Sequence, residues 1–172
     1  VFISIFILSP INISYAKDIV VINLEKLIND NNSYINIIDE IEKDQKKYKS
    51  EFNKEENAIK KLSKQIERDR LILNEAEVNS LIENYNNKLS KLSERIERFN
   101  LHYQNEIINI RNQIFKEIII LLEKYVNDNN IKLVFDSNNY LIASNSIDIT
   151  TIIHEKMSEI NLKLGFENFE KN

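Results

Sequence analysis

The chain has 172 residues, of which 42% are hydrophobic and 29% are charged, and its formal net charge is −4. A single glycine and no cysteine exclude glycine-rich phosphate loops, disulfides and cysteine zinc sites, because such sites need several glycines or thiolate ligands. The acidic balance gives no overall attraction for nucleic acid, so we expect no nucleic-acid partner.

The first sixteen residues have the pattern of a secretory signal peptide. An uncharged apolar run over residues 1–8 is followed by the only proline, and Ser14 and Ala16 place small residues at positions −3 and −1 of a cut after Ala16. A buried N-terminal strand is the alternative, whereas the run is shorter than the ~20 residues of a membrane-spanning helix. We therefore expect residues 1–16 to direct export into a bacterial envelope compartment.

The segment after this leader is predicted to be a buried strand and then a long helical region. Residues 19–24, IVVINL, are apolar and β-branched almost throughout, which is typical of a strand that is buried on both faces. A short helical turn over residues 25–28 and a polar break over residues 29–33 follow. Residues 35–127 contain neither glycine nor proline and are rich in Lys, Glu and Leu, which predicts long helix.

Apolar residues recur every three or four positions along this helical region, so they share one helix face. The recurrence is strong from Val78 to Tyr125 and weaker from Ile35 to Ile66, where polar residues interrupt it. The weakest stretch is residues 74–79, where we expect the chain to reverse and form an antiparallel two-helix arm. A single continuous helix is the alternative, but it would separate the terminal β segments by more than about 100 Å.

The C-terminal part is predicted to return to the first strand. Residues 132–144 have the pattern of a strand, an asparagine turn at Asn138 and Asn139, and a second strand, since asparagine tolerates positive φ. Asp148 is a suitable N-cap for a closing helix over residues 149–164, whose apolar residues again recur at helical spacing.

The predicted base, residues 17–34 and 128–172, is too small for a self-sufficient core. Short β-branched strands of such a base are best buried by neighbouring copies. We therefore predict an α+β fold, mostly α, with a small β-core built by oligomerisation and one long helical-hairpin arm per subunit. The residues expected to build the oligomer core are Ile19, Val20, Val21, Ile22, Leu24, Leu133, Val134, Phe135 and Leu141.

The sequence predicts no enzyme, no cofactor and no metal site. His154 begins a stretch like HExxH, but its fifth position is Ser158, so the second zinc ligand is missing. Asp30 begins a stretch like a calcium loop that lacks the glycine needed for its sharp turn. His102 has no second histidine near it with which to bind a metal.

The outer part of the arm is locally basic within an acidic chain. Residues 42–70 contain ten lysines and arginines against seven acidic residues. Pairing of opposite charges four residues apart on a solvated helix is the simplest interpretation. The functional alternative is a weak attraction for an acidic client protein or for anionic lipid headgroups.

The most specific sequences are IVVINLEKLIND, residues 19–30, and LVFDSNNYLIASNSIDIT, residues 133–150. These segments, with the export signal and the long helical region between them, resemble the Skp/OmpH periplasmic chaperones over essentially the whole mature chain. The resemblance implies a homotrimer with a β-core and three helical tentacles around a cavity. It also implies a periplasmic location and ATP-independent holding of unfolded outer-membrane β-barrel proteins.

By this resemblance, client contacts would come from arm positions that face the cavity. The candidate client or lipid contacts are Tyr48, Phe52, Lys60, Lys61, Lys64, Ile66, Arg68, Arg70, Tyr85 and Phe99. Packing within the arm is the alternative for the apolar members. Binding of lipopolysaccharide or an anionic membrane would depend on the basic members, because this chain is acidic where family members are often strongly basic. A coiled-coil spacer or adaptor of the envelope is the alternative function, although a spacer has little use for buried strands.

Overall fold

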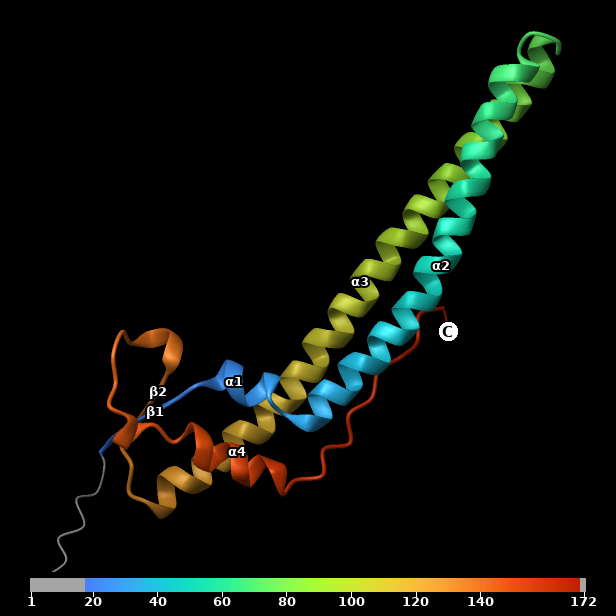
Figure 1. Ribbon diagram of the computed structural model, residues 1–172. Coiled ribbons are helices and arrows are strands. Elements are labelled where there is room, and N and C mark those ends of the chain that lie inside the picture. The colour runs from blue at the N-terminus through green and yellow to red at the C-terminus, as the bar shows by residue number, and fades with distance from the viewer. Residues whose placement is uncertain (1–17, 171–172) are drawn as a thin grey trace, which may run out of the picture.

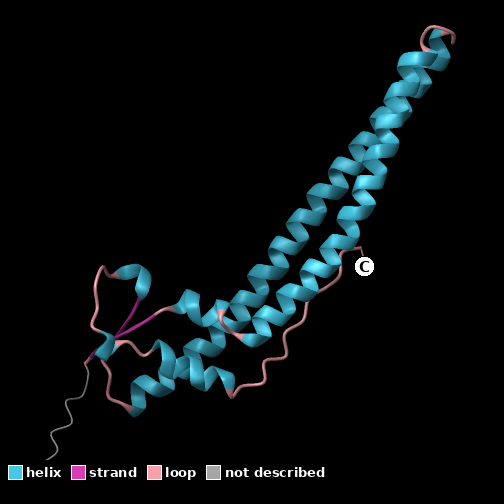
Figure 2. Ribbon diagram, viewed as in Figure 1, coloured by secondary structure: helices cyan, strands magenta, loops and turns pink. Residues whose placement is uncertain are grey.

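The computed structural model describes residues 18–170, so the predicted leader lies outside the described residues. A small base carries two long helices that lie side by side and extend far beyond it (Figures 1 and 2). The main elements in chain order are β1 (Ile19–Ile22), α1 (Leu24–Asn29), α2 (Asn32–Asp69), α3 (Glu75–Asp128), β2 (Leu133–Asp136) and α4 (Thr150–Ser158).

Asparagine side chains start the three helices of the first half. Asn23, Asn31 and Asn74 precede α1, α2 and α3, and each side-chain oxygen accepts a hydrogen bond from a backbone N–H of the first turn at 2.8 to 3.1 Å. Asparagine is among the preferred residues at this position because it satisfies N–H groups that have no partner within the helix. At α3 the Glu77 side chain also accepts from the Asn74 N–H at 3.1 Å, which completes a capping box. The predicted reversal over residues 74–79 is therefore misplaced, since the turn ends at Asn74 and the following residues are helical.

The two long helices differ in length, and the base forms around the part of the longer helix that extends past the shorter one. At 1.5 Å per residue, the 38 residues of α2 span about 57 Å and the 54 residues of α3 span about 80 Å. The longer α3 runs past the start of α2, and both α1 and α4 pack on this extension. Ile110, Ile114 and Ile118 of α3 are completely buried, as is Ile153 of α4.

The predicted apolar stripe on α3 is confirmed in its inner half. All buried residues of α3 from Leu92 to Ile118 belong to that stripe. On α2 the predicted stripe is partly wrong, because Ile35, which was expected to pack, is half exposed and Ile37 is buried instead. The packing face of α2 therefore starts from a different residue than the spacing predicted.

The sheet consists of β1 and β2, which pair in parallel with Ile19 opposite Leu133. Asp148 adds a single parallel bridge to Val21, on the other side of β1 from β2. One face is buried through Val20 and Ile22, which are 0% and 1% exposed. On the other face Val21 is buried, whereas Ile19, Leu133 and Phe135 are 40 to 45% exposed, and parallel sheets are ordinarily covered on both faces.

The prediction of a second strand in the hairpin is wrong. After β2 the chain makes one 3-10 turn, Ser137–Asn139, and residues 140–144 form a loop in place of a strand. The carboxylate of Asp136 accepts hydrogen bonds from the Leu24 N–H at 3.0 Å and the Asn138 N–H at 3.3 Å. These bonds tie the end of β2 to the start of α1, so the turn does not return the chain along β2. Although burial opposes it, the accepted hydrogen bonds lower the pKa of Asp136.

The closing helix begins near its predicted position but is shorter than predicted. Asp148 accepts a hydrogen bond from the Thr150 N–H at 2.8 Å, although Ile149 occupies the formal cap position. α4 ends at Ser158 and not at residue 164, and residues 161–168 leave the base without helix or strand. We call residues 160–170 the C-terminal strap. It runs along the arm, where every second side chain from Leu162 to Asn168 is partly covered and Phe169 is buried, although the sequence analysis placed it with the base.

Candidate functional site

Aromatic rings from both helices of the arm gather where the C-terminal strap ends. Phe99 of α3 packs edge-on against Phe52 of α2 at 5.2 Å between ring centroids and against Tyr103 at 5.0 Å. Phe169 of the strap adds its ring 5.2 Å from Tyr48 and 5.5 Å from Phe99, again nearly perpendicular. All five rings are buried. Edge-to-face geometry is the arrangement that aromatic quadrupoles favour, so the strap completes a packed cluster.

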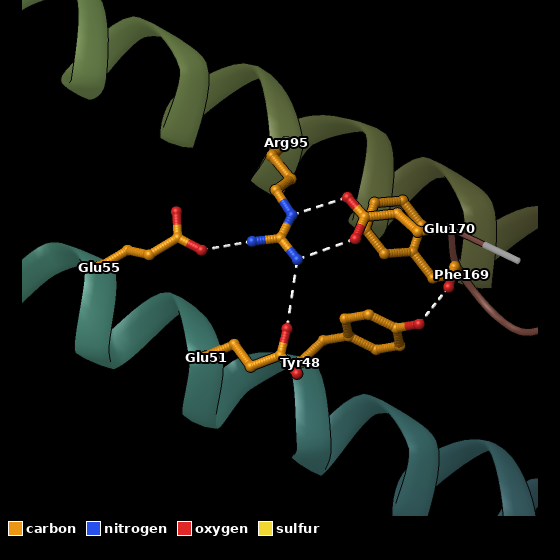
Figure 3. A network of polar contacts seen from close by, with 6 residues as sticks. All are labelled: Tyr48, Glu51, Glu55, Arg95, Phe169 and Glu170. Atoms are coloured by element: carbon orange, nitrogen blue, oxygen red, sulfur yellow. Dashed lines mark hydrogen bonds and ion pairs between the residues drawn. The ribbon is translucent and has the colours of Figure 1, made fainter.

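Arg95 of α3 stands beside this cluster and binds carboxylates from three places (Figure 3). Its Nε and Nη2 donate to the two carboxylate oxygens of Glu170 at 2.7 and 2.8 Å. It also donates to Glu51 at 3.2 Å and to Glu55, both on α2, and its guanidinium lies 5.1 Å from the centre of the Phe52 ring. This fork geometry suits bidentate recognition of a carboxylate. Arg95 therefore fastens the end of the strap to both helices.

The main chain of the strap is held by side chains of the arm. The hydroxyl of Tyr48 donates to the carbonyl oxygen of Phe169, and the hydroxyl of Tyr103 accepts from the Phe169 N–H at 3.5 Å. Two residues earlier, the carbonyl of Glu167 accepts from His102 Nε2 at 2.7 Å and its N–H donates to the Glu106 carboxylate at 3.2 Å. The arm thus satisfies both backbone groups of two alternate strap residues.

The two tyrosines are held in their neutral form. Burial is the largest cause that raises the pKa of Tyr103, and its hydrogen bond to the Asp44 carboxylate adds to it. Burial also raises the pKa of Tyr48. A neutral hydroxyl can donate and accept at the same time, which is the role that Tyr103 has between Asp44 and the strap.

We expect the anchor at Glu170 to weaken in acid. The hydrogen bonds from Arg95 lower the pKa of Glu170 from its ordinary value of 4.5. A carboxylate with a lowered pKa contributes its full stabilisation above the ordinary value and loses it as the pH falls through the lowered value. The near-UV circular dichroism of the buried tyrosines should therefore decrease between about pH 5 and pH 3. Glu170→Gln should remove this step, and an unchanged curve in that variant would contradict the assignment.

Three predicted contact residues, Tyr48, Phe52 and Phe99, meet in this cluster, and all three are at least 91% buried. Their rings are covered by the arm itself and by the strap. For these residues, packing within the chain is the arrangement observed in the single subunit.

A second group of predicted contacts lines an open groove further out on the arm. Lys60, Lys61 and Lys64 of α2 and Tyr85 of α3 border this groove of about 780 Å³, together with Leu89, Leu92, Glu56 and Glu67. Lys60 forms an ion pair with Glu56 at 2.8 Å, so the groove carries mixed charge over an apolar floor. Ile66 is half buried and lies outside the lining.

The remaining predicted contacts, Arg68 and Arg70, are exposed near the turn at the end of the arm. They do not line the groove. The turn that follows them presents two apolar side chains, Leu71 and Ile72, which are 89% and 84% exposed. The sequence analysis did not identify this apolar tip.

The predicted oligomer-core residues divide into two sets. Val20, Val21 and Ile22 are buried within the single chain, and Leu24 and Val134 are partly covered. The exposed set has 40% or more of its surface open and consists of Ile19, Leu133, Phe135 and Leu141.

Sequence reasoning missed Arg95, Phe169 and Glu170. The one available signal was the alternation of Leu162, Leu164 and Phe166 with polar residues, a period of two that is typical of extended chain. Nothing in the sequence connects this alternation with Arg95, which lies about seventy residues earlier.

No cluster of three or more His, Cys, Asp or Glu side chains within residues 18–170 could hold a metal ion. None of the helices in that range combines the length and apolar character needed to cross a membrane.

Comparison with known proteins gives a match to one family model and matches to solved structures. The family model described as outer membrane protein (OmpH-like) matches residues 18–157. The crystal structure of a candidate outer membrane chaperone (OmpH-like) from Caulobacter crescentus CB15 shares the fold, with a TM-score of 0.66 and 10% sequence identity. The alignment covers 91% of this chain and 94% of that one. A search of curated proteins finds no match.

Proposed function

Because the chain belongs to the family of OmpH-like outer membrane proteins, whose model matches residues 18–157, we propose that it is a periplasmic chaperone that works without ATP. It would bind unfolded outer-membrane β-barrel proteins between helical arms and prevent their aggregation. The family match carries this proposal, because it spans both the base and the arm. The fold shared with the candidate chaperone of Caulobacter crescentus supports it.

The open side of the small sheet supports assembly into a homotrimer. Ile19, Leu133 and Phe135 remain 40 to 45% exposed on a parallel sheet of two strands, and such a sheet is marginal unless its other face is covered. Leu141 in the adjoining loop is fully exposed. Copies of the same chain that meet through these side chains would bury them and would leave three arms projecting from one base.

The arm offers an unfolded client many weak contacts. The outer groove places Tyr85, Leu89 and Leu92 between charged residues, and the tip exposes Leu71 and Ile72. Contacts from several arms would add through effective concentration. Binding then removes the unfolded client from aggregation by mass action, without a chemical cycle. The arginines beside the tip would also favour an anionic lipid surface or lipopolysaccharide.

Light scattering tests this proposal directly. A urea-denatured outer-membrane β-barrel protein is diluted into buffer with increasing amounts of the chain, and scattering is recorded with and without ATP. We expect aggregation to be suppressed when about one trimer is present per client, with no effect of ATP. The absence of suppression at a threefold excess of trimer would contradict the proposal and favour an envelope spacer.

A further inference from the structure

We propose that the aromatic cluster of the arm is a binding site for extended peptide segments, and that the C-terminal strap occupies it as a built-in ligand. We call this site, formed by Tyr48, Phe52, Phe99, His102 and Tyr103, the aromatic groove. Its ligands are extended chains in which apolar and polar side chains alternate and in which an aromatic residue precedes an acidic one. The inference deepens the proposed function, on which it rests, by naming the kind of client segment that the arm recognises.

The backbone contacts are those of a peptide site. Tyr48 and His102 donate to the C=O groups of strap residues 169 and 167, and Tyr103 and Glu106 accept from the N–H groups of the same two residues. Every residue except proline has both groups, so these contacts are indifferent to the sequence of the bound segment. Because they engage residues two apart, they fit an extended chain, whose side chains point alternately to opposite sides, up to the turn at Phe169 and Glu170. The same principle operates where a peptide is added to the edge of a sheet.

The side-chain contacts give this site its preference. The ring of Phe169 is only 5% exposed and lies 5.2 to 5.7 Å from Tyr48, Phe99 and His102. An aromatic side chain fills this position better than a smaller one, because buried rings gain both area and edge-to-face contact. Arg95 binds the carboxylate of the next residue, Glu170, through two hydrogen bonds.

Contacts that do not involve the strap also hold the groove residues in place. Arg95 donates to Glu51 and Glu55 on α2, and Tyr103 donates to Asp44. The rings of Phe52, Phe99 and Tyr103 contact one another directly. A site with oriented donors binds a ligand at a smaller entropic cost.

The strap itself is held weakly enough to be exchanged. Within residues 160–170 it contains no helix or strand, and only Phe169 is buried. Glu170 has a φ of 61°, in the left-handed region that a residue with a Cβ rarely adopts. Segments with few buried contacts and no regular hydrogen bonding open readily. As a tethered ligand the strap competes at high effective concentration, so only a client that engages several sites would displace it.

Binding of the strap sequence in trans tests the inference. A fluorescein-labelled peptide with the sequence of residues 161–172 is titrated with the full-length chain, and its fluorescence anisotropy is measured. The release variant carries Phe166→Ser and Phe169→Ser, which free the groove without changing it. We expect this variant to bind the peptide at least tenfold more tightly than the unchanged chain. Lys163→Ser, an exposed position in the same strap, should behave as the unchanged chain does.

Three further measurements make the result specific. A peptide with both phenylalanines replaced by serine should not bind, and adding Arg95→Met to the release variant should weaken binding at least threefold. Glu170→Gln, which leaves every ring in place, should release the strap in part and give an intermediate affinity. Equal peptide binding by the unchanged chain and the release variant would overturn the inference. So would the absence of binding to a release variant and a Glu170→Gln variant whose far-UV circular dichroism shows intact helices.

The scattering assay separates this inference from the proposed function. Suppression of aggregation by a chain whose released groove binds no peptide would overturn the groove as a peptide site and leave the chaperone proposal standing. Tight peptide binding by a release variant that suppresses no aggregation would overturn the chaperone proposal, while the groove would stand as a peptide site.

Discussion

Replacing Leu133 and Phe135 with aspartate should convert the proposed trimer into single chains and abolish most of the client binding that we propose for it. These side chains are 44% and 40% exposed on the open face of the sheet, where we propose that subunits meet. Burying an unpaired carboxylate at such a contact is strongly unfavourable. Mass photometry or light scattering should give the mass of one chain, and client affinity should fall roughly 100-fold, because contacts from separate arms no longer add.

Ile35→Asp is the matched control for this pair. Ile35 is 50% exposed on α2, away from the sheet, so its replacement should leave both the mass and the aggregation assay unchanged. An unaltered mass for the Leu133→Asp and Phe135→Asp variant would remove the open sheet face from the proposed assembly. A single-chain mass with full suppression of aggregation would show that one arm is sufficient to hold a client.

Ile114→Ala should be the most destabilising of the conservative substitutions in the base. Ile114 is completely buried, as are Ile110 and Ile118 one turn to either side. Truncation leaves a cavity in a close-packed region, which costs about 2–5 kcal/mol of the free energy of unfolding. Urea denaturation followed by far-UV circular dichroism measures this loss. Phe115→Ala, at a neighbouring position that is 40% exposed, should cost less than about 1 kcal/mol, and an equal loss in both variants would contradict the assigned core.

The long helices were the most predictable part of the fold. Their apolar residues keep a helical spacing over many turns, and burial along α3 from Leu92 to Ile118 follows that spacing. The family resemblance drawn from residues 19–30 and 133–150 is confirmed by the match over residues 18–157. Both successes rest on patterns that are contained in a short stretch of sequence.

The strap could not be predicted because its sequence fits two periods. Met157, Ile160 and Leu164 continue a helical stripe, whereas Leu162, Leu164 and Phe166 alternate as an extended chain does. The arm decides between them, because its hydroxyl and imidazole groups bind the strap backbone and the Arg95 guanidinium binds the Glu170 carboxylate. Those partners lie on helices far away in the sequence, and local propensity does not register them.

The second strand of the hairpin failed for a related reason. The asparagine pair does form a turn, but Asp136 ties that turn to the first residue of α1. The apolar residues Leu141 and Ile142 then remain almost fully exposed in a loop. A β-branched, apolar pattern does not distinguish a strand within one chain from a surface that a second copy covers.

The outer part of the arm is less buried than the base. The base contains side chains with no exposed surface, whereas none of residues 60–91, all of which the structure describes, is buried. The local free energy of opening follows the density of such contacts, so it should be lowest at the tip and highest at the base. We therefore expect the arm to be most flexible at its tip and most rigid at the base. In the proposed assembly the distal turns would splay to fit clients of different girth, while the base, where we propose that the subunits meet, would keep its shape.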